Sequence, residues 1–367
     1  HIGRPGAGVC PVRGHSNVQG DRTVGINHNP SAKFLSDLHD STGIAIPTKP
    51  GVDSVRAVKS MRGGTAKVFL SMGGNFVSAM SDTKATASAL SNCSITAQIS
   101  TKPNRSHLVT GRTALILPCL GRSEKDHTSV GEQFVSVENS MGIVHSSRGS
   151  SKPASGMLRS EPSIVSGIAG ALDTRIGRSG IAWQDLAEDY DKVRDMIEAT
   201  IPGFEGYNER VRLDGGFYLP NPPRDSRTFP TESGYANFRV HDLSGASAGT
   251  GRYLMMTIRS HDQYNTTIYG LDDRYRGINK GRRVVLMNQS DMDDNDWSKG
   301  DLVDLTSHFE GNELHAREWY IVPYEIPKGN IATYFPEANV LVPLDSVAEG
   351  SNTPTSKSVV VTIRAAD

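Results

Sequence analysis

The sequence contains few cysteines and no long apolar run. Its three cysteines, Cys10, Cys93 and Cys119, are scattered over 367 residues, and no Cys-x-x-Cys pair occurs. Local spacing therefore supplies neither a zinc site nor an iron–sulfur site. Scattered thiols favour a reducing compartment, so we expect a cytoplasmic protein. No apolar run reaches the roughly 18–20 residues that a transmembrane helix needs, and we expect no membrane insertion.

Positive charge is not in excess either. The 39 basic and 40 acidic residues give a formal net charge of −1, so the basic surplus that drives non-specific nucleic-acid binding is missing. A hydrophobic content of 37% with 22% charged residues is typical of a globular chain. A chain of this length is expected to form two domains.

What the sequence does have is a glycine-rich segment at its start. Residues 3–21 read Gly-Arg-Pro-Gly-Ala-Gly-Val-Cys-Pro-Val-Arg-Gly-His-Ser-Asn-Val-Gln-Gly-Asp. Glycines let the backbone approach a bound group closely. Between them stand a fixed cation, Arg13, an imidazole, His15, and two amides, Asn17 and Gln19. This composition is typical of a loop folded around an anionic or very polar ligand, and equally of a cluster of surface turns.

An alternation of strand and helix patterns predicts an α/β domain over residues 63–202. Its alanine-rich segment 83–90 has helical spacing and lies between two strand patterns, which makes a βαβ unit and implies a parallel sheet. Two further helices are expected at 160–172 and 183–200. The expected buried strands are 67–72, 94–100 and 113–118.

Polar turns follow the first two of these strands. Gly73-Gly74-Asn75 and Ser100-Thr101 stand at the carboxyl ends, where parallel sheets bind their ligands. A glycine-bearing turn that leads into a helix can hold a phosphate group, although most such turns only connect elements.

The chain changes character after this region. Residues 203–252 are rich in Gly, Pro, Asn and Asp, which predicts a linker with little regular structure and one short strand at 234–238. Over 253–367, short strand patterns separated by turn residues indicate a β-barrel or a sandwich. These strands are expected at 254–259, 283–288, 301–306, 316–324 and 358–363.

The first of these strands runs directly into a loop that is dense in hydrogen-bonding side chains. Residues 257–270 read Thr-Ile-Arg-Ser-His-Asp-Gln-Tyr-Asn-Thr-Thr-Ile-Tyr-Gly, which suits a polar ligand better than an ordinary solvated loop. A further motif, Ala-Thr-Tyr-Phe-Pro-Glu-Ala-Asn-Val-Leu-Val-Pro-Leu at 332–344, is followed by Thr-Pro-Thr-Ser-Lys at 353–357. Taken alone, Asn339 is a turn former and Lys357 a solvated charge.

These segments, in this order, resemble the catalytic subunits of molybdopterin oxidoreductases, in the branch similar to formate dehydrogenase alpha subunits. The opening segment matches that family's Pro-x-Arg-Gly-(Gln/His)-x-Asn-Val-Gln-Gly, in which the arginine and the residue two positions on face the substrate. The resemblance therefore implies Arg13 and His15 as catalytic residues. His15 departs from the glutamine of well-known formate dehydrogenases, and this leaves the substrate open.

The resemblance implies a fold that is α/β plus β: a Rossmann-like parallel-sheet domain at 63–202 and a double-psi β-barrel domain at 253–367. It implies a bis(molybdopterin guanine dinucleotide) cofactor with molybdenum or tungsten. The chain starts without Met inside a functional loop, so we expect 1–62 to end a truncated domain, with the metal ligand and an iron–sulfur cluster upstream. The implied cofactor contacts are Asn17, Gln19, Gly73, Gly74, Asn75, Ser100, Thr101, Arg259, His261, Gln263, Asn265, Tyr334, Asn339 and Lys357.

The implied activity is two-electron oxidation or reduction of a small anion such as formate, with electrons passed to the iron–sulfur cluster and on to a partner subunit. Arg13 would bind a carboxylate through both of its terminal nitrogens, and His15 would take or relay a proton. The segment alone is expected to be inactive. Two alternatives remain: a cofactor-binding or redox-partner subunit without turnover, and a nucleotide-binding module unrelated to pterin.

Overall fold

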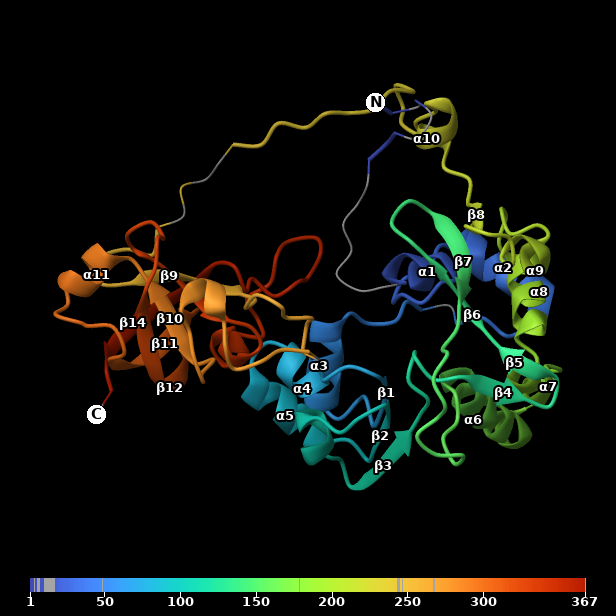
Figure 1. Ribbon diagram of the computed structural model, residues 1–367, viewed down its shortest axis with the longest axis horizontal. Helices are drawn as coiled ribbons and strands as arrows, with labels where there is room; N and C mark the ends of the chain where they lie inside the picture. The colour runs from blue at the N-terminus through green and yellow to red at the C-terminus, as the bar shows by residue number, and fades with distance from the viewer. Residues whose placement is uncertain are drawn as a thin grey trace. The chain divides into compact units, whose positions relative to one another are not determined.

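Figure 1 shows the computed structural model of the chain, which contains two compact units. The first unit is His1–Gly51 with Pro118–Asp242, and the second is Val52–Leu117 with Leu243–Asp367. The expected α/β domain at 63–202 is therefore shared between the two units and divided at Pro118. The structure describes residues 1–2, 4, 7–9, 17–47, 49–177, 179–242, 245, 247–266 and 268–366.

The second unit begins with a small parallel sheet and its helices. Strands β1 (Val68–Met72) and β2 (Ile95–Ser100) pair in parallel, and β3 (Thr113–Pro118) lies beside β2. Helices α3 (Ser54–Arg62) and α5 (Thr83–Ser91) pack through a common apolar cluster, and α4 (Phe76–Ala79) and the 3-10 helix η1 (Arg105–Leu108) follow the strand ends. The predicted βαβ unit is thus confirmed.

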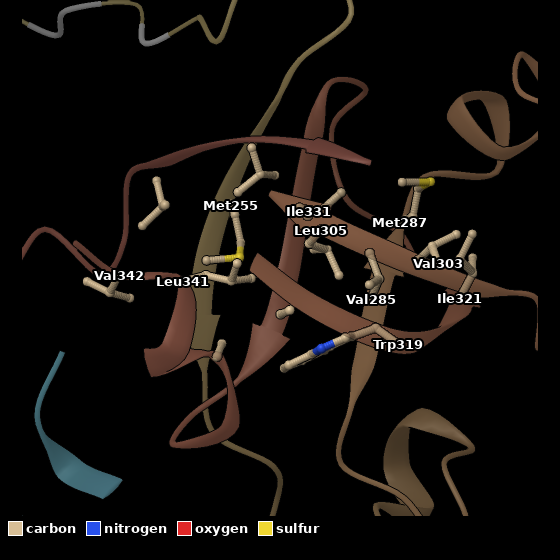
Figure 2. Close-up of a cluster of buried hydrophobic side chains, with 14 of the residues drawn as sticks. Met255, Val285, Met287, Val303, Leu305, Trp319, Ile321, Ile331, Leu341 and Val342 are labelled. Atoms are coloured by element: carbon tan, nitrogen blue, oxygen red, sulfur yellow. The ribbon is translucent and has the colours of Figure 1, made fainter. Parts of the chain in front are cut away.

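The rest of the second unit is a closed six-stranded barrel. Its strand order is β10-β12-β11-β14-β9-β13, with parallel pairs β10–β12 and β13–β9 among antiparallel ones. Figure 2 shows apolar side chains of the barrel strands gathered in one cluster, Met255, Val285, Leu305, Ile321 and Ile331 among them. The strands are β9 (Tyr253–Ile258), β10 (Val284–Met287), β11 (Leu302–Phe309), β12 (Asn312–Pro323), β13 (Asn330–Tyr334) and β14 (Val359–Ala365). The predicted barrel is confirmed, although β13 was not expected.

The barrel is fixed to the α/β part of its unit through the 3-10 helix η3 (Glu337–Leu341) and the chain after it. The side-chain Nδ2 of Asn339 donates hydrogen bonds to the carbonyls of Ser78 and Ala79, at 2.8 and 3.0 Å. The backbone N–H of Asp82 donates to the carbonyl of Val342 at 2.8 Å. The two parts therefore form one unit, in which their loops can share a site.

The first unit contains seven helices and two small sheets among the described residues. Strands β4 (Asp126–Thr128) and β5 (Gly131–Gln133) form a hairpin, and β6 (Val135–Glu138), β7 (Ile143–Ser147) and β8 (Phe217–Tyr218) form a three-stranded sheet. Its helices are α1 (Val18–Thr23), α2 (Ala32–Thr42), α6 (Glu161–Ile176), α7 (Trp183–Glu188), α8 (Tyr190–Thr200), α9 (Tyr207–Arg210) and α10 (Pro222–Ser226). No helix in the described part of the whole chain is long and apolar enough to cross a membrane.

Two sequence predictions for this unit need correction. The helix expected at 183–200 is two helices, because the side chain of Asp189 caps α8 by accepting from the backbone N–H of Asp191 at 3.0 Å. The expected linker 203–252 is in part a core, because several of its apolar side chains are buried together with Phe134 and with Val144 of β7. The core residues of this stretch are Phe204, Tyr207, Val211, Phe217 and Leu219. The strand expected at 234–238 is absent, and Phe238 is exposed.

Candidate functional site

A pocket of about 380 Å³ lies in the second unit, at the carboxyl ends of β1 and β2. On the α/β side it is lined by the turns 73–75 and 100–105, and by Ser78 and Thr83. On the barrel side it is lined by Thr266, Tyr269, Pro336, Glu337 and Val340. The five residues predicted from the two turns, Gly73, Gly74, Asn75, Ser100 and Thr101, are thus brought together on one pocket.

The first turn leaves backbone exposed to this pocket. Gly73 and Gly74 have φ angles of 65° and 72°, in the left-handed region that favours glycine. A Cβ atom built at either position would have no atom within 4 Å, so both glycines border open space. The backbone of the turn is therefore free to approach a bound group closely.

The two turns hold each other in place. The hydroxyl of Ser106 donates to Oδ1 of Asn75 at 2.9 Å and accepts from the backbone N–H of Val77 at 2.9 Å. Nδ2 of Asn104 donates to the carbonyl of Gly74 at 2.7 Å. The turn conformation is thus set by side chains of the second turn and of η1.

The charges around the pocket have both signs. Lys102 and Arg105 line it from the α/β side, where parallel strands end. Glu337 lines it from the barrel side, and its Oε1 accepts from Nε of Arg282 at 2.9 Å. The other oxygen, Oε2, is buried and has no hydrogen-bond partner among the described residues. The pocket therefore offers cations for an anionic group and one acceptor for an N–H donor.

Arg282 supports the barrel loop that follows β9. It is buried, and it was not among the site residues predicted from the sequence. Its guanidinium donates to Oγ of Ser260 at 2.8 Å, to Oε1 of Gln263 at 3.0 Å and to the carbonyl of Phe335 at 2.8 Å. It also lies over the ring of Tyr269, 4.3 Å from the centroid. Arg282 therefore connects the polar loop to Glu337 and Tyr269 of the pocket lining.

The amide of Gln263 is fully used inside the protein. Its Nε2 donates to the carbonyls of Asn265 and Phe335, both at 2.8 Å, and its Oε1 accepts from the backbone N–H of Ser260 at 2.9 Å. Arg259 donates to Oδ1 of Asn265 in the same loop. Gln263 thus shapes the loop, and its contact with a ligand stays a prediction.

A buried carboxylate, Asp273, lies next to His261 and Tyr334. Nδ1 of His261 is 3.0 Å from Oδ1 of Asp273, and the Tyr334 hydroxyl donates to Oδ2 at 2.7 Å. Tyr334 is only 1% exposed, and burial together with the hydrogen bond to Asp273 raises the pKa of its hydroxyl. The Tyr334 hydroxyl thus supports the Asp273 carboxylate, and a cofactor contact of Tyr334 stays a prediction. No spacing signal marks Asp273, which follows another aspartate in a turn.

The two remaining predicted contacts of the barrel domain are also bound within the protein. Asn339 is 3% exposed, and its Nδ2 donates to the carbonyls of Ser78 and Ala79 in α4. Nζ of Lys357 donates to the carbonyl of Thr257 at the end of β9. Burial lowers the pKa of Lys357, and the nearby charge of Arg259 lowers it further. Lys357 and Arg259 therefore place two cations beside the start of the polar loop.

Residues 253–360 match the family described as molydopterin dinucleotide binding domain. The chain carries the dinucleotide binding domain of the molybdopterin oxidoreductases. This confirms the family that the sequence motifs indicated. Acetylene hydratase from Pelobacter acetylenicus shares the fold: the superposition covers 94% of this chain and 52% of that one, with a TM-score of 0.52 at 11% identity.

Curated relatives support this placement. An uncharacterized oxidoreductase of Mycobacterium tuberculosis is 51% identical over 366 residues, which are 98% of this chain and 47% of that protein. Protein YdeP of Escherichia coli is 44% identical over 369 residues, 98% of this chain and 48% of its own length. The chain thus spans about half the length of these relatives. A putative formate dehydrogenase of Bacillus subtilis, YrhE, is 32% identical over 78 residues, 19% of this chain.

The expected substrate residues, Arg13 and His15, lie outside the described residues. The segment after them is described and is attached to β6. Oδ1 of Asn17 accepts from the backbone N–H of Glu138 at 3.0 Å, and Oγ1 of Thr23 donates to Oε2 of Glu138 at 2.5 Å. Burial raises the pKa of Glu138 even though hydrogen bonds from Thr23 and Gln19 oppose the shift.

Gln19 and Glu138 line a second cavity, of about 630 Å³, in the first unit. Arg224 also lines this cavity, but its guanidinium donates hydrogen bonds to the side chain of Asp225 and to the carbonyls of Met141 and Leu219. Asn17 and Gln19 belong to the first unit, whereas the pocket of about 380 Å³ belongs to the second. Among the residues that the structure describes, no group of three or more His, Cys, Asp and Glu could hold a metal ion.

Proposed function

We propose that the whole protein is a molybdenum- or tungsten-dependent oxidoreductase with a bis(molybdopterin guanine dinucleotide) cofactor, and that the pocket of the second unit binds the nucleotide end of one dinucleotide. The observation that carries the proposal is that the matched barrel domain and the predicted phosphate turns line one polar pocket. Curated relatives that are named oxidoreductases support the redox activity.

The residues of the pocket fit such a group. Phosphate oxygens would lie against the open backbone of Gly73 and Gly74 and between the cations of Lys102 and Arg105. The half-exposed ring of Tyr269, supported by Arg282, offers a surface for a base. The orphaned Oε2 of Glu337 is an acceptor for a base N–H.

The finer assignments rest on the sequence motifs and stay proposals. We propose a small anion such as formate as substrate, supported by Arg13, His15 and the short match to YrhE. The bound metal and its pterins would supply the two-electron transfer, with an iron–sulfur cluster and a partner subunit as acceptors. Arg13 would orient the anion and His15 would hold a proton. A cytoplasmic location and a double-psi crossover of the barrel strands belong to the same proposal.

Two glycine substitutions in the full-length protein test the pocket. Gly74→Leu places a side chain in the pocket, whereas the control Gly64→Leu carries a similar φ angle of 73° and faces open space outside it. Both changes place leucine at a positive φ angle, which costs roughly 1–2 kcal/mol of backbone strain. We expect Gly74→Leu to lose most of the bound pterin, measured as its fluorescent oxidation product, while Gly64→Leu keeps it. Equal pterin contents in the two variants would contradict the proposed site.

A further inference from the structure

Glu138, the last residue of β6, holds the start of helix α1 in place. Its backbone N–H donates to Oδ1 of Asn17 at 3.0 Å, and its side-chain Oε2 lies 2.5 Å from Oγ1 of Thr23. The side chain of Gln19 also donates a hydrogen bond to this carboxyl. One buried residue of the three-stranded sheet is thus bonded to three residues of the neighbouring segment, and it was not among the site residues predicted from the sequence.

The same attachment explains a glycine of the opening motif. Asn17 has a φ angle of 62°, in the left-handed region, and its side chain lies against Gly20. A Cβ atom built at Gly20 would be 2.1 Å from Oδ1 of Asn17, the oxygen that accepts from the N–H of Glu138. A side chain at position 20 would therefore push Asn17 away from Glu138. The sequence of the segment is thus fitted to its bond with β6.

The contacts of Thr23 indicate that Glu138 carries a proton. Oγ1 of Thr23 lies 3.1 Å from the carbonyl oxygen of Gln19 and 2.5 Å from Oε2 of Glu138. A hydroxyl has one hydrogen, so beside an ionised carboxylate it can donate to only one of these two oxygens. With a proton on Oε2, Glu138 donates to Thr23 and Thr23 donates to Gln19, so both contacts are hydrogen bonds. Burial favours this neutral form and raises the pKa of Glu138.

Charged and titratable groups also lie around Glu138 on the neighbouring elements. Arg224 of α10 lines the same cavity, but its guanidinium donates to Asp225. Asp21 of α1 and Tyr207 of α9 are each hydrogen-bonded to a neutral side chain. The hydrogen bonds from neutral side chains do not outweigh the burial of Glu138. Among the residues that the structure describes, the ionised carboxylate therefore has no ion pair to stabilise it.

This attachment is close in the chain to the expected substrate residues. Asn17 follows His15 by two positions and Arg13 by four. A chain spans at most about 3.6 Å per residue, so the position of Asn17 limits where these two side chains can reach. A displacement of about 1 Å at a reacting group can lower a rate by about a hundredfold. A contact that fixes Asn17 therefore matters for catalysis as well as for stability.

We infer that Glu138 is a positioning residue of the substrate site: its neutral carboxyl fixes the segment that carries Arg13 and His15. The inference rests on the proposed function, which assigns these two residues to the substrate. When Glu138 ionises, Thr23 loses one of its two hydrogen bonds and a buried charge lies beside the segment. Opening of the segment exposes that charge to water, so the open form becomes more populated as the pH rises.

Two substitutions of Glu138 separate its hydrogen bonds from its ionisation. Glu138→Gln keeps a donor for Thr23 and an acceptor for Gln19, and its amide cannot ionise. Glu138→Leu has a similar size but loses every side-chain hydrogen bond. The same two changes at the exposed Glu209, in the same unit, are the matched controls.

The first readout is hydrogen exchange of peptides that cover residues 13–24 in the full-length holoprotein, with each rate divided by the intrinsic rate at that pH. In wild type we expect faster exchange of this segment at pH 8 than at pH 5. Glu138→Gln should exchange slowly at both values. Glu138→Leu should exchange roughly tenfold faster than Glu138→Gln at both, the effect of losing two hydrogen bonds. Peptides of α8 and both Glu209 variants should show none of these changes.

The second readout is turnover with formate as the probe. We expect kcat/KM of Glu138→Leu to fall roughly tenfold because its substrate residues are misplaced, and Glu138→Gln to retain the wild-type value at pH 5. The ratio of kcat/KM in Glu138→Gln to that in wild type should rise from pH 5 to pH 8, because only wild type ionises at this position. Taking the ratio cancels the titration of every other group.

Two results would overturn the inference while leaving the proposed function in place. One is exchange of residues 13–24 in Glu138→Leu at the wild-type rate, or an acceleration that extends equally to α8, which would mean a general loss of stability. The other is a kcat/KM that is unchanged in Glu138→Leu although the segment exchanges faster. Wild-type protein that contains no pterin, or does not turn formate over, would overturn the proposed function and with it the substrate role of Glu138.

Discussion

At the scale of single residues, charge and burial together decide what each polar side chain does. Lys102 and Arg105 remain at the pocket surface and can meet an anion, whereas Arg282 is buried and serves the protein's own oxygens. Arginine suits this inner position because its planar fork satisfies several acceptors at once. The same residue type thus contributes to binding in one place and to positioning in another.

Glu138 gives a prediction with a defined pH dependence. Its pKa is raised by burial in the folded state, so its protonated form is favoured there. Its contribution to stability is complete below the ordinary glutamate range near about 4.3 and is lost as the pH rises through the raised value. The glutamine side chain of the variant Glu138→Gln does not ionise, so the variant does not lose this stability as the pH rises. We therefore expect the difference in melting temperature, variant minus wild type, to increase from pH 4 to pH 7.

The exposed Glu209→Gln in the same unit is the control, and its melting temperature should differ from wild type by the same small amount at each pH. If the difference between Glu138→Gln and wild type were constant over this range, burial would not control the ionisation of Glu138.

At the scale of elements, η3 is the piece that joins the barrel to the α/β part. Asn339→Asp replaces the two N–H donors to Ser78 and Ala79 by a buried carboxylate that faces carbonyl oxygens. An unpaired buried charge costs about 3–5 kcal/mol, so the melting temperature should fall by at least about 5 °C. Hydrogen exchange should accelerate at the amides of α4 and η3 in particular.

Asn312→Asp, at the exposed first residue of β12, supplies the same chemical change as a control and should leave both properties unaltered. Slow exchange at α4 in Asn339→Asp would show that the two parts are held together by other contacts.

The elements themselves were predictable where their periodicity is strong. The βαβ unit and five barrel strands follow from short buried runs between turn residues. Two features were missed because local chemistry overrides the pattern: Asp189 caps and divides a helix, and the aromatic residues of 204–217 form a core inside a Gly- and Pro-rich stretch. β13 overlaps a segment, 332–344, that was interpreted only as a ligand motif.

The sequence predicted the α/β side of the pocket but not its barrel side. The turns at 73–75 and 100–101 follow from strand ends, which a sequence pattern locates. The barrel side of the pocket depends on how η3 and the loop around Tyr269 pack against those turns, and no local spacing encodes that contact. Asp273 and Arg282 were missed for the same reason, since their partners lie up to 61 residues away in the sequence.

At the scale of the whole molecule, the chain passes through each compact unit in two separate segments. Only the second unit contains both the matched dinucleotide binding domain and the parallel sheet that lines its pocket. The first unit contains Asn17 and Gln19, next to the segment with Arg13 and His15. The cofactor contacts proposed for the turns 73–75 and 100–101 thus belong to the second unit, and those predicted at Asn17 and Gln19 to the first.

Metal and pterin analysis of the full-length protein tests the central claim most directly. The protein would be purified from cells that synthesise the pterin and analysed for molybdenum, tungsten and the fluorescent pterin oxidation product. The account predicts one metal atom and two pterins per chain, and then turnover of a small anion such as formate in a substrate screen. Metal and pterin without any turnover would favour the non-catalytic subunit. The absence of both metals and of pterin would contradict the account.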